Sequence, residues 1–213
     1  LSAVVLSPTR LKVTFDEKMS ASTVLANHFT ISGVIDVGGV VSEADSKSII
    51  LDLSSTLQEN TAYQLTVNNI TECSGNLILP SAREATLVIA VAASSLDILI
   101  NEILFDPKSG GVRFVELYNN SNKYISLKDW RLHGVSNDRV ISTEDIILPP
   151  STYKTITTDG AILKNQYPNT DGQTVVQMSS LPSLPSDKGN VTIMSKAGLL
   201  IDMLDYDKDY HSS

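Results

Sequence analysis

Short runs of alternating apolar and polar residues are the feature that most constrains the fold of this chain. Leu11, Val13 and Phe15 alternate with polar residues, and the run from Tyr63 to Asn68 has the same pattern. A period of two is typical of an antiparallel strand with one face buried and one face in water. Further strands are predicted at Ser48–Leu53, Ala85–Val91, Ile98–Leu104, Arg113–Tyr118, Val191–Met194 and Leu199–Tyr206.

Turn residues separate these runs, and helical periodicity is almost absent. The one stretch with a helical pattern is Ser20–Asn27, which is long enough for one or two turns. Prolines in Ser179–Ser186 predict an extended crossover, and Ser136–Pro150 is expected to form a long surface loop followed by an edge strand. Many short strands without a long helix predict an all-β chain built of β-sandwiches.

The length of the chain indicates two domains. With 213 residues, it can form two units of about 100 residues, each large enough to bury a core of its own. Small residues at Ala92–Ser95 separate two strand-like runs. We therefore expect domains at residues 1–93 and 96–213, joined by a short linker.

The charge of the chain argues against nonspecific binding of nucleic acid. The chain has 16 lysine and arginine residues and 24 aspartate and glutamate residues, which gives a formal net charge of -8. A net negative surface repels phosphate backbones. No apolar run approaches the roughly 20 residues of a membrane helix, so no transmembrane segment is expected.

The first half contains, in order, a strand with an acidic turn, a short helical turn, two further strands and a Gly-Asn turn. These pieces are Leu11–Met19, Ser20–Phe29 with Ile31, Leu51–Ser54 with Leu57–Val67, and Ile70–Asn76. In the order of these pieces, the first half resembles the S-layer-type bacterial Ig-like domain.

The second half, from about Asp97 to Tyr210, contains a series of strand motifs in a distinctive order. These motifs are Ile100–Ile103 with Asp106-Pro107, Phe114–Asn119, Ile125–Leu132 with the single tryptophan, Leu148–Pro150 with Tyr153, Lys188–Ile193, and Ile201-Asp202 with Asp205-Tyr206. In these motifs the second half resembles the lamin-tail domain family. Bacterial relatives commonly continue past the position of Tyr206 into a Gly-Trp-rich segment. We therefore expect this domain to be C-terminally truncated, or the chain to be part of a longer protein.

These resemblances imply two tandem Ig-like β-sandwiches with a non-catalytic role. Lamin-tail domains have no established catalytic residues, and in bacteria they occur in secreted or surface proteins. The implied function is a secreted, periplasmic or cell-surface module for adhesion, anchoring or spacing, which binds a protein or glycan partner. The alternative is an accessory region of a secreted nuclease or hydrolase whose catalytic domain lies outside this chain. The chromatin binding of nuclear lamins is not expected here, because of the acidic balance.

No catalytic residues are predicted. His28, His133 and His211 are spread along both halves, and no Gly-x-Ser-x-Gly elbow is present. We expect ordinary surface or capping histidines. Cys73 has no cysteine partner and no basic neighbour in sequence, so we expect an inert thiol.

Two carboxylates lie in strongly apolar strands. Glu102 lies between Ile100 and Leu104, and Glu116 between Phe114 and Tyr118. Because an unpaired buried charge is costly, each must be exposed, paired or hydrogen-bonded. The favoured interpretation is structural, with bonds to backbone amides or to Arg131. The functional alternative is a shared metal or ligand site that adds Asp106 or Asp129.

The acidic run near the C-terminus predicts at most a weak calcium site. Asp202, Asp205, Asp207 and Asp209 offer carboxylates at a spacing that can begin a calcium loop. Tyr210 stands where a calcium loop has glycine, and no closing glutamate follows. A solvated acidic tail is the favoured interpretation, and no other cofactor is expected.

Trp130 alternates with Leu132 and is therefore expected in the sandwich core. The family-motif residues Asn101, Glu102, Glu116 and Trp130 are all expected to have structural roles. The alternative is an exposed sugar-stacking platform. A second platform would have to come from the tyrosines at 118, 124, 153 or 167. For partner contact, we expect the loops Phe105–Val112 and Ser136–Leu148 to be used.

Overall fold

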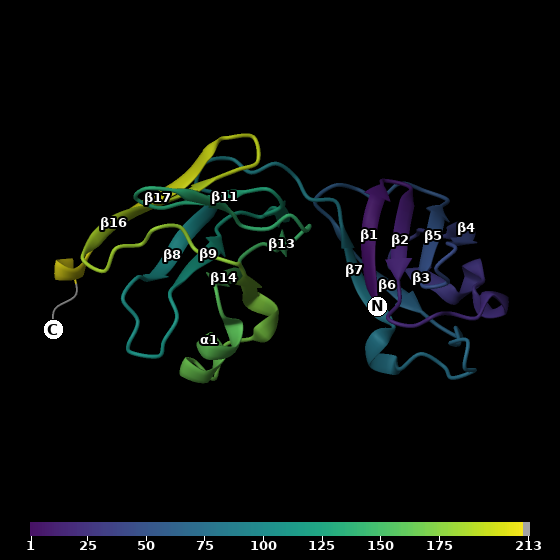
Figure 1. Ribbon diagram of the computed structural model, residues 1–213. Helices are drawn as coiled ribbons and strands as arrows, with labels where there is room; N and C mark the ends of the chain where they lie inside the picture. Colours follow the sequence, from purple (N-terminus) through teal and green to yellow (C-terminus); the bar gives the residue numbers. More distant parts are fainter. Residues whose placement is uncertain (211–213) are drawn as a thin grey trace. The chain divides into compact units, whose positions relative to one another are not determined.

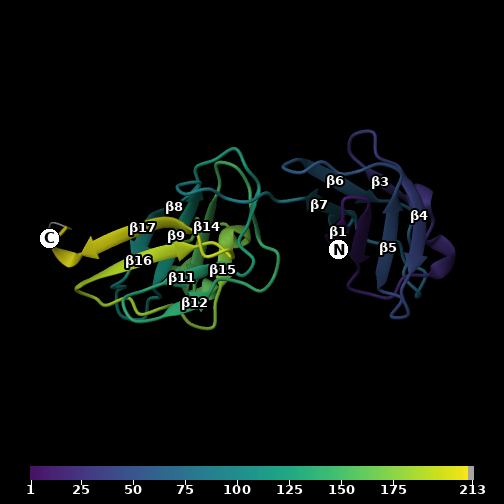
Figure 2. The same cartoon turned by 90° about the horizontal axis from the view of Figure 1, so that it is seen from above.

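The computed structural model describes residues 1–210 and divides the chain into two compact units, Leu1–Ile89 and Ala90–Ser213. The division lies a few residues before the expected linker. The amide of Val91 donates to the carbonyl of Tyr124, and the amide of Leu96 donates to the carbonyl of Ile201. These two hydrogen bonds attach residues 90–96 to the second unit. Both units are all-β, and each is described by itself (Figures 1 and 2).

The first unit is a sandwich of two antiparallel sheets. One sheet has the order β1-β2-β5-β4 and the other β3-β6-β7. The strands are β1 (Ser2–Ser7), β2 (Arg10–Thr14), β3 (Phe29–Ile31), β4 (Val37–Ser42), β5 (Ser48–Leu53), β6 (Ala62–Val67) and β7 (Glu84–Val88). The alternating residues Leu11, Val13 and Leu65 are fully buried between the sheets, so the period-two pattern explains this core.

The helix expected at Ser20–Asn27 is replaced by two short 3-10 helices, η1 (Ala21–Thr23) and η2 (Ala26–His28). A third one, η3, spans Pro80–Ala82. None of the three has a buried residue. Without an apolar face to bury, a single turn gains too little packing energy to extend into an α-helix.

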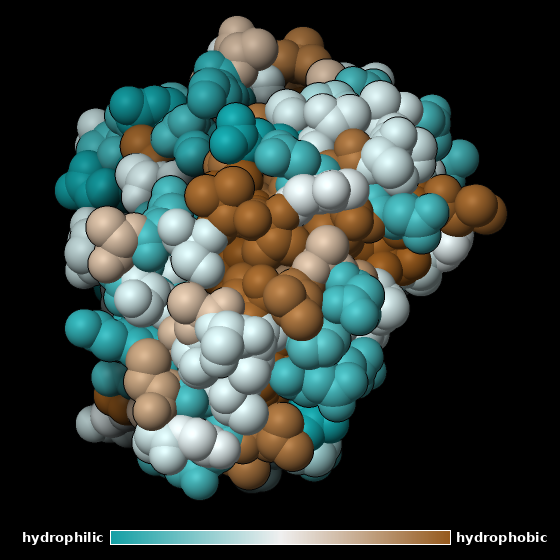
Figure 3. Space-filling view, turned by 90° about the vertical axis from the view of Figure 1, so that its right-hand side faces the viewer, coloured by the Kyte–Doolittle hydropathy of each residue, from teal (hydrophilic) through white to brown (hydrophobic). Residues whose placement is uncertain are grey.

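The first unit also leaves apolar side chains at its surface. In the view of Figure 3, apolar residues gather in the middle of one face and polar residues surround them. Val34 is 96% exposed, and the other exposed large apolar residues of this unit are Val4, Leu6, Leu25, Val41, Leu77 and Leu79.

The second unit contains two four-stranded sheets and a two-stranded one. The sheet orders are β15-β14-β9-β8, β12-β11-β16-β17 and β10-β13. The strands are β8 (Ile98–Leu104), β9 (Phe114–Asn119), β10 (Ile125–Ser126), β11 (Arg131–His133), β12 (Asp138–Val140), β13 (Ile147–Leu148), β14 (Tyr153–Thr157), β15 (Val175–Gln177), β16 (Lys188–Met194) and β17 (Leu200–Asp207). All pairs are antiparallel except β14 with β15.

One core joins the two larger sheets of this unit. Leu117, Leu132 and Ile193 are fully buried in it, and Trp130 is 4% exposed. The stretch predicted to be a loop and an edge strand contains both β12 and β13, and the proline-rich crossover between β15 and β16 has no strand of its own. The strands β16 and β17 form a long hairpin that both ribbon views show (Figures 1 and 2).

A short α-helix, α1 (Gly160–Gln166), was not predicted. The carboxylate of Asp159 caps it by accepting hydrogen bonds from the amides of Ala161 and Ile162. Leu163 is buried in a small second core against Phe114. The helix thus covers one end of the outer face of the β9 sheet (Figure 1). Two 3-10 turns, η4 (Gly172–Thr174) and η5 (Lys208–Tyr210), complete the unit.

Candidate functional site

The part of the outer face that α1 leaves open carries aromatic and polar side chains in register. Leu99, Tyr118 and Tyr153 are paired across β8, β9 and β14. The neighbouring row pairs Glu102 with Glu116 and Glu116 with Thr155. We call the residues Asn101, Glu102, Glu116, Tyr118 and Tyr153 the tyrosine face.

Glu116 is fixed by neutral donors. Its Oε1 accepts from Asn101 Nδ2 at 2.8 Å, and its Oε2 accepts from Thr155 Oγ1 at 3.3 Å. The register of β8 shifts between Ile100 and Glu102, so that an additional residue of β8 faces Glu116. Glu102 is exposed. The family-motif residues Asn101, Glu102 and Glu116 are therefore brought together at one place.

The expected partner Arg131 is not near these carboxylates. It pairs with Asp138 across β11 and β12, in the other sheet. The sequence pattern missed Asn101 as the partner because the extra residue of a bulge cannot be seen in a period-two row. Among residues 1–210, no group of three or more His, Cys, Asp or Glu side chains is arranged to hold a metal ion.

Tyr118 and Tyr153 form an aromatic pair. Their ring centroids lie 4.7 Å apart with planes tilted by 34°. Tyr153 is 43% exposed, and Tyr118 is half-buried. Tyr167 lies elsewhere, with its ring edge-on to Phe114 at 5.9 Å. The sequence offered both residues of the pair but contained no signal that placed them on one surface.

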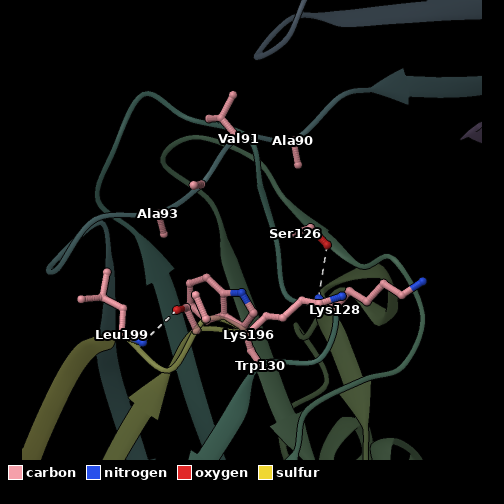
Figure 4. Close-up of a pocket in the computed structure, with 11 residues that line it drawn as sticks. Ala90, Val91, Ala93, Ser126, Lys128, Trp130, Lys196 and Leu199 are labelled. Atoms are coloured by element: carbon pink, nitrogen blue, oxygen red, sulfur yellow. Dashed lines mark hydrogen bonds between the residues drawn. The ribbon is translucent and has the colours of Figure 1, made fainter. Parts of the chain in front are cut away.

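Trp130 does not present its ring faces to solvent, since it lies in the core at 4% exposure. It does contribute to the wall of a cavity of about 310 Å³. Figure 4 shows the indole of Trp130 below the extended segment that carries Ala90 and Ala93, with Lys196 beside the ring. The residues that line this Trp130 cavity are Ala90, Val91, Ala92, Ala93, Ser126, Lys128, Trp130, Ser195, Lys196, Ala197 and Leu199.

Two lysines line this cavity, and each side of it has a carboxylate close by: Asp145 accepts a hydrogen bond from the hydroxyl of the lining Ser126, and Asp129 pairs with Lys196. Lys196 Nζ lies 2.9 Å from Asp129 Oδ2, in a pair that is exposed on both sides. The hydrogen bond from Lys196 lowers the pKa of Asp129 by more than desolvation raises it, and the positive charges of Lys196 and Lys128 lower this pKa further. Asp129 is thus held ionised, and Lys128 lies close enough to influence it.

The aspartates of the predicted calcium segment have separate partners. Asp202 Oδ2 accepts from the backbone amide of Ile100 at 2.7 Å, which ties β17 to the free edge of β8. Asp205 Oδ1 accepts from Asn190 Nδ2 at 2.6 Å, and Asp207 Oδ1 accepts from the amide of Asp209 at 3.0 Å. Calcium binding at these residues stays a prediction, which thermal unfolding with and without calcium can test.

The histidines and the cysteine are dispersed. His28 Nδ1 lies 2.8 Å from the carbonyl oxygen of Thr23, and His133 lies on β11, where its Nε2 is buried without a partner among the described residues. His211 lies outside the described residues. The exposed Cys73 lies in the first unit, with Sγ 3.4 Å from the carbonyl oxygen of Met19.

The two loops expected to contact partners are partly built into the fold. Phe105, at the start of the first loop, stacks on Tyr206 with centroids 4.4 Å apart. Arg113 Nε donates to the carbonyl oxygen of Phe105 at 2.6 Å and fixes the end of this loop.

In the described part of the chain, no helix is long and apolar enough to cross a membrane.

Comparisons with known proteins give two family matches. Residues 91–208 match the model of the Lamin Tail Domain, and residues 2–87 match that of the Bacterial Ig-like domain. No curated protein matches the chain.

Similar solved structures include three of the bacterial S-layer protein SbsC. Its N-terminal part is 15% identical with a TM-score of 0.39, over 97% of this chain and 43% of that one. The structure of residues 31–844 is 12% identical with a TM-score of 0.39, over 100% and 32% of the two chains. That of domains 1–6 is 14% identical with a TM-score of 0.38, over 98% and 32%. The chain therefore spans less than half of the length of each of these structures.

Proposed function

Because the chain belongs to the lamin tail domain family and carries a bacterial Ig-like domain ahead of that domain, we propose that it is an exported bacterial cell-surface module without catalysis of its own. In this role it anchors or spaces a larger protein and binds a protein or glycan partner. The tyrosine face is the observation that carries the proposal.

The tyrosine face has the chemistry of a contact surface. Tyrosine offers a large, partly polar contact area at a low cost in conformational entropy, and it is enriched at interfaces for this reason. Tyr118 and Tyr153 restrict each other through their ring contact, and Asn101 and Thr155 hold Glu116. A partner would therefore meet side chains that are already ordered on a rigid sheet.

A role in anchoring or spacing is supported by the separate cores of the two units. Each unit has its own buried cluster, so each can keep its shape by itself. The apolar surface of the first unit, shown in Figure 3, offers an additional place for contact with the rest of a larger protein.

A binding assay on bacterial cells and on isolated cell-envelope fractions tests the proposal. The fluorescently labelled chain should bind, and Tyr153→Ala should weaken binding by about tenfold or more, as the loss of a central aromatic contact does. Tyr153→Phe, which keeps the ring, should retain most of the binding. Tyr167→Ala is the matched control, because Tyr167 is 44% exposed and Tyr153 43%, and it should bind like the unchanged chain.

Thermal unfolding of each variant confirms that the fold is retained. Unchanged binding by Tyr153→Ala would overturn the role of the tyrosine face. No binding of the unchanged chain to any envelope fraction would overturn the surface role and favour an accessory region of a secreted enzyme.

A further inference from the structure

We propose that the free edge of β17 binds an extended, basic segment of a partner protein by strand addition. β17 (Leu200–Asp207) comes last in the sheet order β12-β11-β16-β17, so one of its two edges has no neighbouring strand. Figure 2 shows β17 next to β16 in this sheet. A free edge presents unpaired backbone donors and acceptors, with which another chain can pair.

The hydrogen bonds at the two ends of β17 give the direction of its backbone groups. At one end, the amide of Lys208 donates to the carbonyl of Asp187, on the side of β16. At the other end, the carbonyl of Ile201 accepts from the amide of Leu96, which lies outside β16. The register with β16 is unbroken from 202 to 207, so the direction alternates regularly between these ends.

This alternation directs the backbone groups of Met203, Asp205 and Asp207 to the free edge. Among the described residues, no hydrogen bond uses the amides or carbonyls of these three residues. An added strand would satisfy these groups without breaking any hydrogen bond of the sheet.

The free edge of β8, in the other large sheet of the unit, is less accessible. The carboxylate of Asp202 already accepts from the amide of Ile100, and the register of β8 shifts between Ile100 and Glu102. Bulges and occupied donors hinder the pairing of a further strand. β17 has neither a bulge nor a proline or lysine from 202 to 207, so its edge is the open one.

The charge along this edge favours a basic partner. Asp205 accepts from the neutral amide group of Asn190, and Asp207 accepts from the backbone amide of Asp209. None of the ion pairs among the described residues includes Asp205 or Asp207. Lysine or arginine on an added strand would therefore pair with charges that have no cation of their own.

The two lysines of the hairpin do not neutralise this edge. Segments 187–190 and 202–209 contain five aspartates, at 187, 202, 205, 207 and 209, and two lysines, at 188 and 208. Neither lysine forms an ion pair with a described carboxylate. The excess of negative charge also disfavours a second copy of the chain as the partner, because pairing β17 with itself would bring aspartates together.

The apolar residues of β17 predict alternation in the added strand. Leu204 is paired with the fully buried Val191 and so points to the core side of the sheet, yet it is 38% exposed. An apolar side chain on the added strand would cover it. Because neighbouring side chains of a strand point to opposite faces, the partner segment should alternate apolar residues with basic ones.

Fluorescence anisotropy of a labelled peptide tests the proposal on the full chain. The probe is a short peptide of alternating lysine and valine. The comparison peptides are one of alternating glutamate and valine, and the lysine–valine peptide N-methylated at every backbone amide. We expect saturable binding of the unmodified lysine–valine peptide only, because N-methylation removes the backbone donors and glutamate reverses the charge.

Variants of β17 assign the binding to this edge. Met203→Pro removes an amide that β16 does not use, so the fold should be retained while binding weakens by about tenfold or more. Met203→Ala keeps the amide and should bind nearly like the unchanged chain. Asp205→Asn and Asp207→Asn should each weaken binding by about two- to fivefold, the usual effect of one cross-strand ion pair. Asp36→Asn, at an exposed position of the first unit, is the matched control and should bind normally.

Absence of binding, equal binding of either comparison peptide, or full affinity of Met203→Pro would overturn the proposal. Circular dichroism checks the fold of Met203→Pro, and the comparison peptides decide the question if this variant does not fold. A dimer of the unchanged chain in analytical ultracentrifugation, lost in Met203→Pro, would replace the basic segment by a second copy.

The test is separate from that of the tyrosine face. If Tyr153→Ala loses envelope binding and no peptide binds, the present inference fails and the proposed function stands. If the lysine–valine peptide binds and envelope fractions do not, the edge of β17 stands as a protein-binding site and the surface role fails.

Discussion

At the scale of single residues, Asp97 shows how a charged side chain fixes the start of the second unit. Its Oδ2 accepts from Lys123 Nζ at 2.6 Å and from the amide of Ser94 at 2.7 Å. Burial raises the pKa of Asp97, but the hydrogen bonds from Lys123 and Ser94, with the positive charge of Lys123, outweigh it and leave the pKa below its ordinary value. The ionised form is therefore the one that the folded chain prefers.

This preference predicts a pH dependence of stability. Because the folded pKa is lower than the unfolded one, Asp97 stabilises the chain fully above about pH 4–5, and the contribution is lost as the pH falls through the folded pKa. In Asp97→Asn, the free energy of unfolding measured by urea titration should be lower at pH 7 and should fall less between pH 7 and pH 3.

Lys123→Gln removes the partner and serves as the cross-check, since it should flatten the same pH range. Equal pH dependence of the unchanged chain and of Asp97→Asn would contradict the assignment.

At the scale of elements, the hairpin of β16 and β17 depends on a close approach at one glycine. Gly189 is paired with Tyr206, and a Cβ added to Gly189 would collide with Tyr206 Oη and lie 2.6 Å from its Cζ. Tyr206 is 7% exposed, donates to the carbonyl oxygen of Pro185 at 3.0 Å and stacks on Phe105. The tyrosine cannot move away without losing these contacts.

Gly189→Ala is therefore expected to destabilise the second unit by about 2 kcal/mol, as overpacking of a filled site does. Chemical denaturation followed by circular dichroism measures the change. Gly172→Ala is the control, because an added Cβ there meets nothing within 4 Å, and it should leave stability nearly unchanged. A loss of the same size in both variants would contradict the role given to the contact with Tyr206.

At the scale of the whole molecule, the two units are organised around separate cores. Leu65 is fully buried in the core of the first unit and Leu132 in that of the second. No residue is common to the two clusters. Units with separate cores can unfold as separate cooperative transitions.

Calorimetry of paired variants tests this independence. Leu65→Ala should destabilise the first unit by about 2–5 kcal/mol through the cavity it leaves, and should lower one transition only. Leu132→Ala should lower the other. A single transition that both variants shift equally would instead show that the units unfold together.

The sequence could predict those elements whose pattern lies in neighbouring residues, and it missed those that depend on contacts between distant residues. The alternation of Leu11, Val13 and Phe15 depends only on neighbouring residues, and it predicted the strand that the structure contains as β2. The strand predicted at Ile98–Leu104 has the same bounds as β8. α1 was missed because it spans only 7 residues, and it is held by the capping of Asp159 and the burial of Leu163 against Phe114.

The amino-acid sequence by itself determined an all-β chain with two tandem sandwiches, because burial of one strand face requires a local period of two. Only the tertiary structure decided which side chains meet. The contacts of Glu116 with Asn101, of Tyr118 with Tyr153 and of Asp202 with the amide of Ile100 join residues 15, 35 and 102 positions apart. The wall of the Trp130 cavity likewise combines three segments that lie far apart in the sequence, 90–93, 126–130 and 195–199. Such contacts depend on strand order, register and a bulge, which are set by the packing of the whole unit and leave no periodic trace in the sequence.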